Sequence, residues 1–375
     1  MMNNKHIVIL NHGLHISGVS RALVNLANLL AAHGYRITIK LASAQFDLAD
    51  ELDPRVQLSL FLPGFVNSSG FRLRIYGKLM QMVSWLPRKL QWFLFVGFGH
   101  DVEIAFNRGM SVAIVSHSMS AKSIKIAWVH SDFMQDCNPR AGFNCDADAV
   151  AGYSRYNRVV CVSQHVKSSF IQHFEDTGNL IVCHNVIDCC KIRRMSAEPF
   201  VFDVKIKHFS IVAVGRLTKA KNYELLIEVA RLMEAAEEAC SFYIIGDGEL
   251  KQILLHKASD VLSVKFLGST SNPYPLMASA DAYLSTSIFE GLSTTVIEAM
   301  ILGLPVVVTD CCGMREIVGD SQWGQLCSFN PEQIASSLSR LIADHNYYEQ
   351  QKRKSLQRGE WLATNEQILS LFTQL

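Results

Sequence analysis

The stretch Ser287–Val318, SIFEGLSTTVIEAMILGLPVVVTDCCGMREIV, places Glu290 and Glu298 around a small-residue turn and then continues into an apolar strand. On one continuous helix, residues eight apart would be separated by about 12 Å of rise and roughly 80° of rotation, so they would not share a face. We therefore expect Glu290 on a loop and Glu298 in the first turns of a helix that ends at Gly303.

A helix that starts beside Glu290 predicts an anion site. The amides near Gly291, Leu292 and Ser293 would lie at the helix N-terminus, where backbone donors lack intrahelical partners. A purely structural interpretation of Glu298 is also open, because Thr295 and Glu298 have the spacing of a capping box, which needs no ligand. Glu290 could likewise be a solvated loop acid.

A second informative stretch lies upstream, at residues 209–233, FSIVAVGRLTKAKNYELLIEVARLM. Residues 211–214 predict a buried parallel strand, Gly215 ends it, and a helix starts after Lys221. Arg216 and Lys221 therefore flank a strand-to-helix loop, the place where ligands gather in open α/β sheets. Two cations there suit a diphosphate, although either could be ordinary surface charge.

Together these motifs resemble the retaining, nucleotide-sugar-dependent glycosyltransferases of the GT-B fold, specifically glycosyltransferase family 4. Glu290 and Glu298 match the E-x7-E signature of that family, and GRLTKAKN matches its phosphate-clamp motif. The segments FYIIGDGE, FLGSTSNPYPLMASAD and PVVVTDCCGMREIV also look like family segments. The resemblance implies an α/β chain with two doubly wound, Rossmann-like domains facing a cleft.

Composition agrees with two such domains and excludes other classes. The 375 residues, 49% of them hydrophobic, are enough for two to three domains with large cores. The chain has 35 basic and 34 acidic residues, so its charge balance gives no sign of nucleic-acid binding. Its ten cysteines contain no CxxC pair, and we expect a reducing cytoplasm. The N-terminal apolar run is too short for a signal peptide, and no run reaches the length of a membrane span.

Alternating strand and helix patterns occur twice along the chain. In the first half the expected strands are 7–10, 36–41, 56–62, 102–106, 124–129 and 159–162, and 20–32 is an expected helix. A second series starts at Phe209 and runs to Val308. We predict an acceptor-binding domain (1–190), a linker (191–207), a nucleotide-sugar-binding domain (208–358) and a C-terminal helix (359–375) that, as the resemblance implies, crosses back to the first domain.

Two residues of the first domain are further candidates. HISGVSRALVNLANLL resembles the glycine-rich first loop and helix of the family, but Ser17 replaces the first of two glycines and only Gly18 remains. His130 follows the apolar strand IKIAWV and matches the position where relatives hold a histidine against the donor sugar. A structural histidine at a strand end is the alternative.

The segment 71–98, FRLRIYGKLMQMVSWLPRKLQWFLFVGF, mixes basic and large apolar residues. This composition suits a surface helix seated in anionic headgroups, with a kink at Pro87. The alternative is a buried helix of the first domain that turns its polar side outward. The first alternative would place the protein at the inner face of the plasma membrane.

The resemblance implies transfer of a hexosyl or N-acetylhexosaminyl group from a nucleoside diphosphate sugar, expected to be UDP-linked, to a growing, lipid-linked surface glycan such as capsule or lipopolysaccharide. Arg216 and Lys221 would neutralise the diphosphate, Glu298 would hold the ribose, and Glu290 and His130 would contact the sugar. No DxD-like pair is placed to hold a metal, so we expect no metal or other cofactor. A GT-B-like phosphorylase, a nucleotide-sugar epimerase and a non-catalytic transferase subunit are the alternatives.

Overall fold

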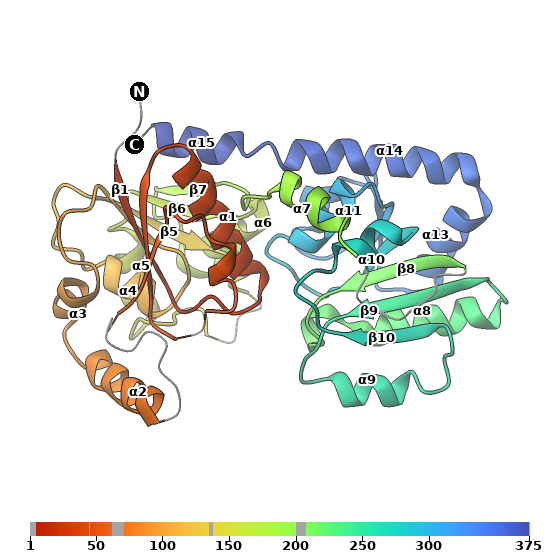
Figure 1. The fold of residues 1–375 in the computed structure, drawn as a ribbon, viewed down its shortest axis with the longest axis horizontal. Coiled ribbons are helices and arrows are strands. Elements are labelled where there is room, and N and C mark those ends of the chain that lie inside the picture. The colour runs from red at the N-terminus through yellow and green to blue at the C-terminus, as the bar shows by residue number, and fades with distance from the viewer. Residues whose placement is uncertain (1–4, 45, 62–70, 135–137, 200–207, 375) are drawn as a thin grey trace. The chain divides into compact units, whose positions relative to one another are not determined.

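The computed structural model describes residues 5–44, 46–61, 71–134, 138–199 and 208–374 and divides the chain into two units (Figure 1). Unit 1 comprises Met1–Val186 with Glu366–Leu375, and unit 2 comprises Ile187–Asn365. The chain enters unit 2 upstream of the predicted linker 191–207, of which 200–207 lies outside the described residues. It returns to unit 1 within the predicted C-terminal helix segment 359–375.

Unit 1 is built on a seven-stranded sheet of order β3-β2-β1-β4-β5-β6-β7, in which every pairing is parallel. Strands of a parallel sheet covered on both faces are apolar throughout, and Ile7, Val8, Ile9 and Leu10 of β1 are fully buried. The strands are β1 His6–Asn11, β2 Arg36–Leu41, β3 Gln57–Leu60, β4 Val102–Ala105, β5 Ile124–Val129, β6 Arg158–Cys161 and β7 Leu180–Val182.

The first helix of unit 1 explains the serine in the glycine-rich motif. Ser17 is the N-cap of α1, and its hydroxyl accepts a hydrogen bond from the Ser20 amide at 3.2 Å. Gly18 is the first residue of α1. The helices of unit 1 are α1 Gly18–Ala32, α2 Phe71–Ser84, α3 Arg88–Phe95, α4 Met110–Val115, α5 Asp146–Tyr153, α6 Gln164–Phe174 and α15 Glu366–Thr373, with a 3-10 turn at Ala49–Glu51.

Unit 2 is built on a six-stranded parallel sheet of order β10-β9-β8-β11-β12-β13. The strands are β8 Phe209–Val214, β9 Cys240–Ile245, β10 Val264–Gly268, β11 Ala282–Ser285, β12 Val306–Thr309 and β13 Gln325–Cys327. The helices are α7 Cys189–Ser196, α8 Tyr223–Ala235, α9 Lys251–Lys257, α10 Tyr274–Ser279, α11 Thr294–Ile301, α12 Met314–Val318, α13 Pro331–Ala343 and α14 His345–Leu362, with a 3-10 turn at Lys219–Lys221.

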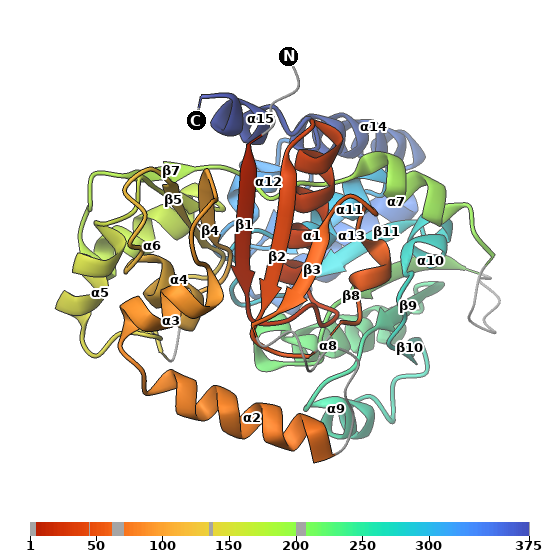
Figure 2. The ribbon, with the colours of Figure 1, turned by 60° about the vertical axis from the view of Figure 1, so that its left-hand side comes forward.

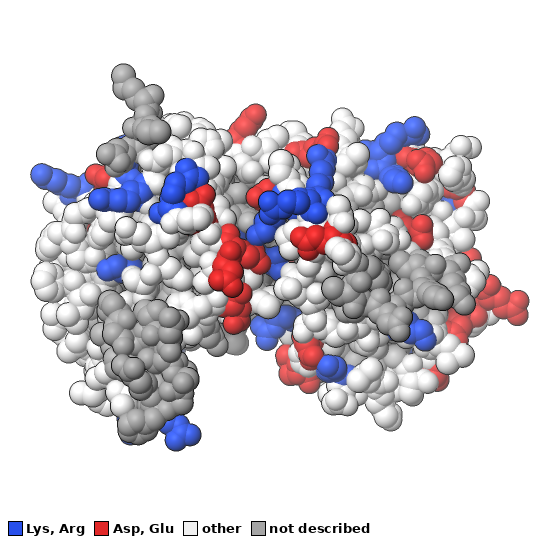
Figure 3. Space-filling model, viewed as in Figure 1, with Lys and Arg blue, Asp and Glu red and all other residues white. Residues whose placement is uncertain are grey.

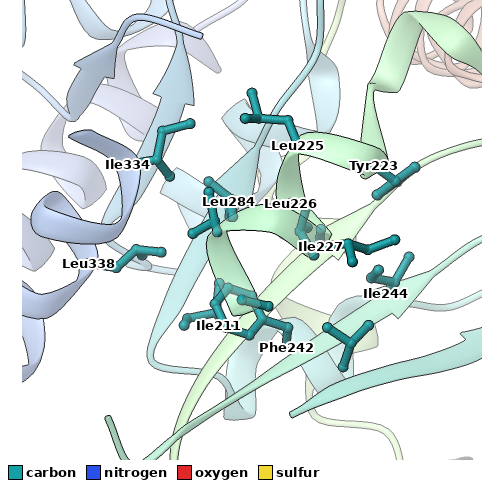
Figure 4. Packing of buried hydrophobic residues seen from close by; sticks show 14 of the residues in the cluster. Ile211, Tyr223, Leu225, Leu226, Ile227, Phe242, Ile244, Leu284, Ile334 and Leu338 are labelled. Atoms are coloured by element: carbon teal, nitrogen blue, oxygen red, sulfur yellow. The ribbon is translucent and has the colours of Figure 1, made fainter. Parts of the chain in front are cut away.

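The core of unit 2 lies between the sheet and the packed helices α8 and α13. Figure 4 shows Ile211, Phe242 and Leu284 of the strands converging with side chains of α8 and α13, including Ile334 and Leu338. This packing fixes β8 and β11 side by side, and hence the loops that follow them.

None of the described helices is long and apolar enough to span a lipid bilayer.

The strand order of each sheet contains one switch point, between β1 and β4 in unit 1 and between β8 and β11 in unit 2. At a switch point the loops that leave the two neighbouring strands run in opposite directions and open a crevice at the carboxyl edge of the sheet. The predicted site residues Arg216 and Lys221 follow β8, and Glu290 follows β11. The sheet topology therefore places both groups at the switch point of unit 2.

Candidate active site

The loops after β8 and β11 are joined by an ion pair between the Lys221 ammonium and the Glu290 carboxylate. Two further contacts connect the same loops: the Ile288 amide donates to the Ala220 carbonyl at 2.7 Å, and the Thr286 hydroxyl donates to the Lys221 carbonyl at 3.0 Å. The side chains of Lys221 and Glu290 remain 21% and 16% exposed. The two predicted residues, 69 apart in sequence, thus form one polar centre at the sheet edge.

Gly215 makes room for this centre. A Cβ atom at Gly215 would lie 2.9 Å from Cε of Lys221 and 3.1 Å from the Tyr223 hydroxyl. Any larger residue would therefore displace the lysine from the end of β8. Gly246 approaches Gly215 in the same way from the loop after β9, since a Cβ there would lie 1.9 Å from the Gly215 carbonyl oxygen. The glycines allow three loops to converge closely on one point.

The electrostatics keep Lys221 charged. Burial is the largest single effect on the pKa of Lys221 and lowers it, but the Glu290 carboxylate together with Tyr283 and Cys311 raises it, and the net shift is upward. The Ser287 hydroxyl donates a second hydrogen bond to Glu290, at 2.9 Å. Burial raises the pKa of the nearby Cys311 thiol to about 12, so this cysteine stays protonated at neutral pH. The site therefore holds a fixed cation and a fixed carboxylate but no thiolate nucleophile at Cys311.

Arg216, the other predicted cation, is exposed on the loop that leaves β8. Its neighbour Leu217 is fully buried and donates its amide to the Asp247 carbonyl at 3.0 Å, which fixes the backbone at this point. The structure thus presents Arg216 to solvent from an anchored loop, on the same strand-to-helix connection as Lys221. An exposed guanidinium on a fixed backbone suits a phosphate ligand.

The predicted placement of one glutamate on a loop and the other in a helix is confirmed. Glu290 lies on the loop, and Glu298 is the fifth residue of α11, only 7% exposed. The capping-box interpretation is wrong, because α11 starts at Thr294 and its N-cap Ser293 makes no side-chain capping bond. Thr295 is therefore already inside the helix, and Glu298 lies beyond the position that a capping-box acid occupies.

Gly291, Leu292 and Ser293 connect Glu290 to α11, as expected. The turn before α12 packs directly on this connection: a Cβ at Gly313 would lie 2.7 Å from the Gly291 carbonyl oxygen. Sequence analysis missed this role of Gly313 and the contact of Ser287 with Glu290. The available signal in the sequence was Gly313 itself, which follows Cys311 and Cys312. The residue against which it packs is distant in sequence and could not be identified.

His130 and Gly18 belong to unit 1. His130 directly follows β5, as predicted, and its Nε2 lies 3.0 Å from the Phe106 carbonyl. Because a carbonyl only accepts, Nε2 carries the proton and Nδ1 keeps its lone pair. Nδ1 is buried and has no hydrogen-bond partner within the described part of the chain. Burial lowers the pKa of His130 to about 4, so the ring is neutral at pH 7 and able to accept from a hydroxyl.

Known proteins resemble this chain in sequence and in fold. Residues 197–358 match the family model described as Glycosyl transferases group 1, and this match lies within unit 2. Unit 2 is therefore similar to the domain that this family model describes. Over 185 residues the chain is 32% identical to an N-acetylgalactosaminyltransferase of Campylobacter jejuni whose name specifies a diphospho-undecaprenol substrate, covering 48% of each protein.

A second curated relative is the poly(ribitol-phosphate) alpha-N-acetylglucosaminyltransferase of Staphylococcus aureus. It is 30% identical over 198 residues, which cover 52% of this chain and 38% of the relative. The chain spans about half the length of the curated relatives it matches. These relatives support a function in glycosyl transfer.

Solved structures match both units over their whole length. Anabaena Alr3699/HepE in complex with UDP and glucose has a TM-score of 0.75 at 19% identity, covering 99% of this chain and 100% of that one. A variant of S. aureus TarM in complex with UDP has a TM-score of 0.78 at 14% identity, covering 99% of both chains. The fold is GT-B.

The buried, neutral state of His130 predicts an acid-dependent loss of stability. Below pH 6.5 the unfolded chain binds a proton at this residue that the folded chain does not bind, so stability falls as the pH drops from 6.5 to about 4. His130→Gln retains a donor for the Phe106 carbonyl and removes the titration. Melting temperatures measured at about pH 7 and about pH 5 should therefore differ less in the variant than in the wild type.

His33→Gln, at an exposed histidine of the same unit, is the matched control and should behave like the wild type. If His130→Gln and the wild type lost equal melting temperature on acidification, the loss would come from groups other than His130.

Proposed function

We propose that the chain is a retaining glycosyltransferase that moves a hexosyl or N-acetylhexosaminyl group from a nucleoside diphosphate sugar to a growing, lipid-linked glycan. The observation that carries this proposal is the Lys221–Glu290 pair at the switch point between β8 and β11, within the region that matches the group 1 glycosyltransferase family model. A switch point binds ligands in other open α/β sheets, and here it offers a cation for phosphate and a carboxylate for sugar hydroxyls.

The names of the relatives support this choice of donor and acceptor. The Anabaena structure contains UDP and glucose, which favours a UDP-linked sugar as donor. The C. jejuni relative acts on a diphospho-undecaprenol substrate, and other relatives are named for amylovoran and lipopolysaccharide core biosynthesis. A surface glycan assembled on a lipid carrier fits all of these names. Such an acceptor would be met at the cytoplasmic face of a membrane.

In the proposed mechanism, Arg216 and Lys221 stabilise the charge that develops on the leaving diphosphate. Glu298 binds the ribose hydroxyls, Glu290 contacts the donor sugar, and Gly215 with the Gly291–Ser293 connection lets the backbone approach the phosphates. A contact with the donor sugar is also proposed for His130.

Retention requires the new glycosidic bond to form on the face from which the diphosphate leaves. Glycoside hydrolases use two carboxyl groups that flank the scissile bond, whereas Glu290 and Glu298 come from one short connection at one sheet edge. We therefore propose a front-side transfer. The acceptor hydroxyl attacks the anomeric carbon, the bond to the diphosphate breaks, and a donor phosphate oxygen takes the hydroxyl proton.

The first prediction from this proposal is donor binding without a metal. A UDP-sugar that binds the folded chain stabilises it by RT ln(1 + [L]/Kd), about 2.7 kcal/mol at 100-fold Kd, so a thermal-shift screen of nucleotide sugars should find a donor that raises the melting temperature by several degrees. Because protein cations carry the diphosphate charge, the shift and the turnover should persist in excess EDTA. Loss of both in EDTA, with recovery on adding manganese or magnesium, would contradict the metal-independent mechanism.

Glu298 provides a test of ribose recognition. Glu298→Gln keeps the shape of this nearly buried side chain but removes the charge-assisted hydrogen bonds to the ribose, which should weaken donor binding about 10-fold or more with little change in melting temperature. Calorimetric titration with UDP measures the effect. Glu332→Gln, in the first turn of α13, is a control for lost charge in the same unit. Unchanged UDP affinity with a lowered melting temperature would make Glu298 a structural residue.

The cations should act mainly on turnover. Negative charge grows on the diphosphate as its bond to the sugar breaks, so Arg216→Met and Lys221→Met should each lower kcat on the order of 100-fold and raise KM less. Because both act on one leaving group, the double variant should lose less than the product of the single losses. Steady-state kinetics with a labelled donor measure both constants.

Two variants separate loss of the cation from damage to the site. Lys221→Met leaves the Glu290 carboxylate without its counter-charge, so the Lys221→Met/Glu290→Gln double variant tests the cation in a neutral site. Lys219→Met removes an exposed lysine from the same loop and should retain turnover. A folded, donor-binding Arg216→Met or Lys221→Met protein with near-normal kcat would show that the cation at that position is only surface charge.

A further inference from the structure

The charge of unit 1 is unevenly distributed along the chain. Between Asp53 and Asp101 the sequence contains no Asp or Glu, although the whole chain has 34 acidic and 35 basic residues. Around the outer part of α2 in Figure 3, the described side chains include blue Lys or Arg and no red acids on the face shown. The basic residues of this acid-free stretch are Arg55, Arg72, Arg74, Lys78, Arg88 and Lys89.

Helix α3 within this stretch buries Trp92 and Phe95 but also exposes large apolar side chains. A surface helix normally buries its apolar side and exposes its polar side. Here Gln91 is fully buried, whereas Leu90, Phe93 and Leu94 are 42%, 53% and 50% exposed. These three residues are spaced i, i+3 and i+4, so they form one stripe on the outward side of α3. The outward side of α3 therefore carries this apolar stripe beside the exposed Lys89.

Buried polar contacts hold α3 in this orientation. The Trp92 indole donates to the Glu103 carboxylate of β4 at 2.8 Å, and Phe95 stacks on Phe61. The Gln91 amide donates to the carbonyls of Ser84 and Leu86 in the turn from α2 to α3, at 3.2 and 2.7 Å. Rotating the helix to bury its apolar stripe would break these bonds and leave Glu103 short of a donor. The exposed stripe is therefore fixed by the fold.

Helix α2 extends the same surface. It lies apart from the sheet of unit 1 in both ribbon views (Figures 1 and 2), and Tyr76 anchors it by donating to the Ala42 carbonyl at 2.7 Å. At about 100° per residue, Ile75, Leu79 and Met82 form a stripe beside the anchored side. Arg74 and Lys78, both exposed, form the next stripe around the helix.

The turn between the helices adds the most exposed aromatic residue of the segment. Trp85 is 78% exposed, and Phe98, after α3, is also exposed. We call Arg74–Phe98 the α2–α3 surface. Large apolar side chains this exposed are rare over so short a segment unless something covers them. Tryptophan with flanking lysine and arginine is typical of side chains at a membrane–water interface.

We propose that the α2–α3 surface docks on an anionic lipid bilayer. Its apolar stripes would enter the headgroup region, and Arg74, Lys78 and Lys89 would face lipid phosphates. A second copy of the chain fits less well, because a two-fold interface would bring the same basic stripe against itself without any acid in the segment to pair with it. A uniformly anionic surface complements the whole segment.

The test is cosedimentation of the full chain with sucrose-loaded vesicles of phosphatidylcholine, with and without phosphatidylglycerol. Binding should require phosphatidylglycerol and should fall as sodium chloride is raised. A variant with Arg74, Lys78 and Lys89 all changed to Gln should bind on the order of 100-fold more weakly, since each charge near the surface contributes a several-fold factor. Arg88 is left unchanged, because it donates to the Gln91 side chain and the Gly142 carbonyl and so supports the fold.

Lys122→Gln/Lys265→Gln/Arg353→Gln removes the same charge from exposed positions elsewhere and should bind like the wild type. A second test variant, Trp85→Ser/Phe93→Ser, should also lose vesicle binding while keeping its melting temperature, because both side chains are exposed. Wild-type binding that is absent, insensitive to salt or equal on neutral vesicles would overturn the proposal. So would self-association of the wild type that Trp85→Ser/Phe93→Ser abolishes without any effect on vesicles.

This proposal does not depend on the proposed enzymatic function. Donor-induced thermal shifts of the α2–α3 variants should equal that of the wild type, because none of the changed residues belongs to the site of unit 2. Failure of vesicle binding with an intact donor shift would reject only the docking surface. Absence of any donor shift with intact vesicle binding would reject only the transferase proposal.

Discussion

The parallel arrangement of β8 and β11 is the constraint on which the candidate site depends. In a parallel sheet the carboxyl ends of all strands lie at one edge, and the strand order puts β8 beside β11 although they are more than sixty residues apart. Lys221 and Glu290 follow these two strands, so their pairing is a consequence of sheet topology. Gly215 and Gly313 then decide how closely the surrounding loops can approach this centre.

Sequence patterns predicted most of this edge, because strand ends in α/β sheets are marked by abrupt changes of residue type. The apolar run 211–214 ends at Gly215, and the helix that follows Glu290 begins at Thr294. Both boundaries lie close to their expected positions. Local patterns, however, cannot identify which distant loop a polar residue meets. The packing of Gly313 on Gly291 joins two separate loops and was therefore missed. The contact of Ser287 with Glu290 spans only three residues, but it depends on the conformation of the loop, which no residue pattern specifies.

The remaining differences have local physical causes. Strand β7 has only three residues at the edge of its sheet, too few to show a period. The predicted capping box is wrong because α11 starts one residue before Thr295. The spacing of the two capping-box residues is correct, but Thr295 lies inside the helix and not at its N-cap. Helix α3 shows a different limit of sequence patterns. Its apolar residues are evident in the sequence, but only the buried hydrogen bonds of Gln91 and Trp92 reveal that the apolar stripe faces outward.

The Lys221–Glu290 pair is better explained by ligand binding than by stability. Moving two charges from water to a partly buried edge costs desolvation energy that their attraction only partly offsets, and a well-packed apolar pair would stabilise the same loops as well or better. The side chains nevertheless keep about a fifth of their surface in solvent. In the proposed function, a diphosphate that binds at this centre would meet a lysine that is already desolvated and oriented. The desolvation cost of the pair would then be offset by stronger binding and by stabilisation of the transition state.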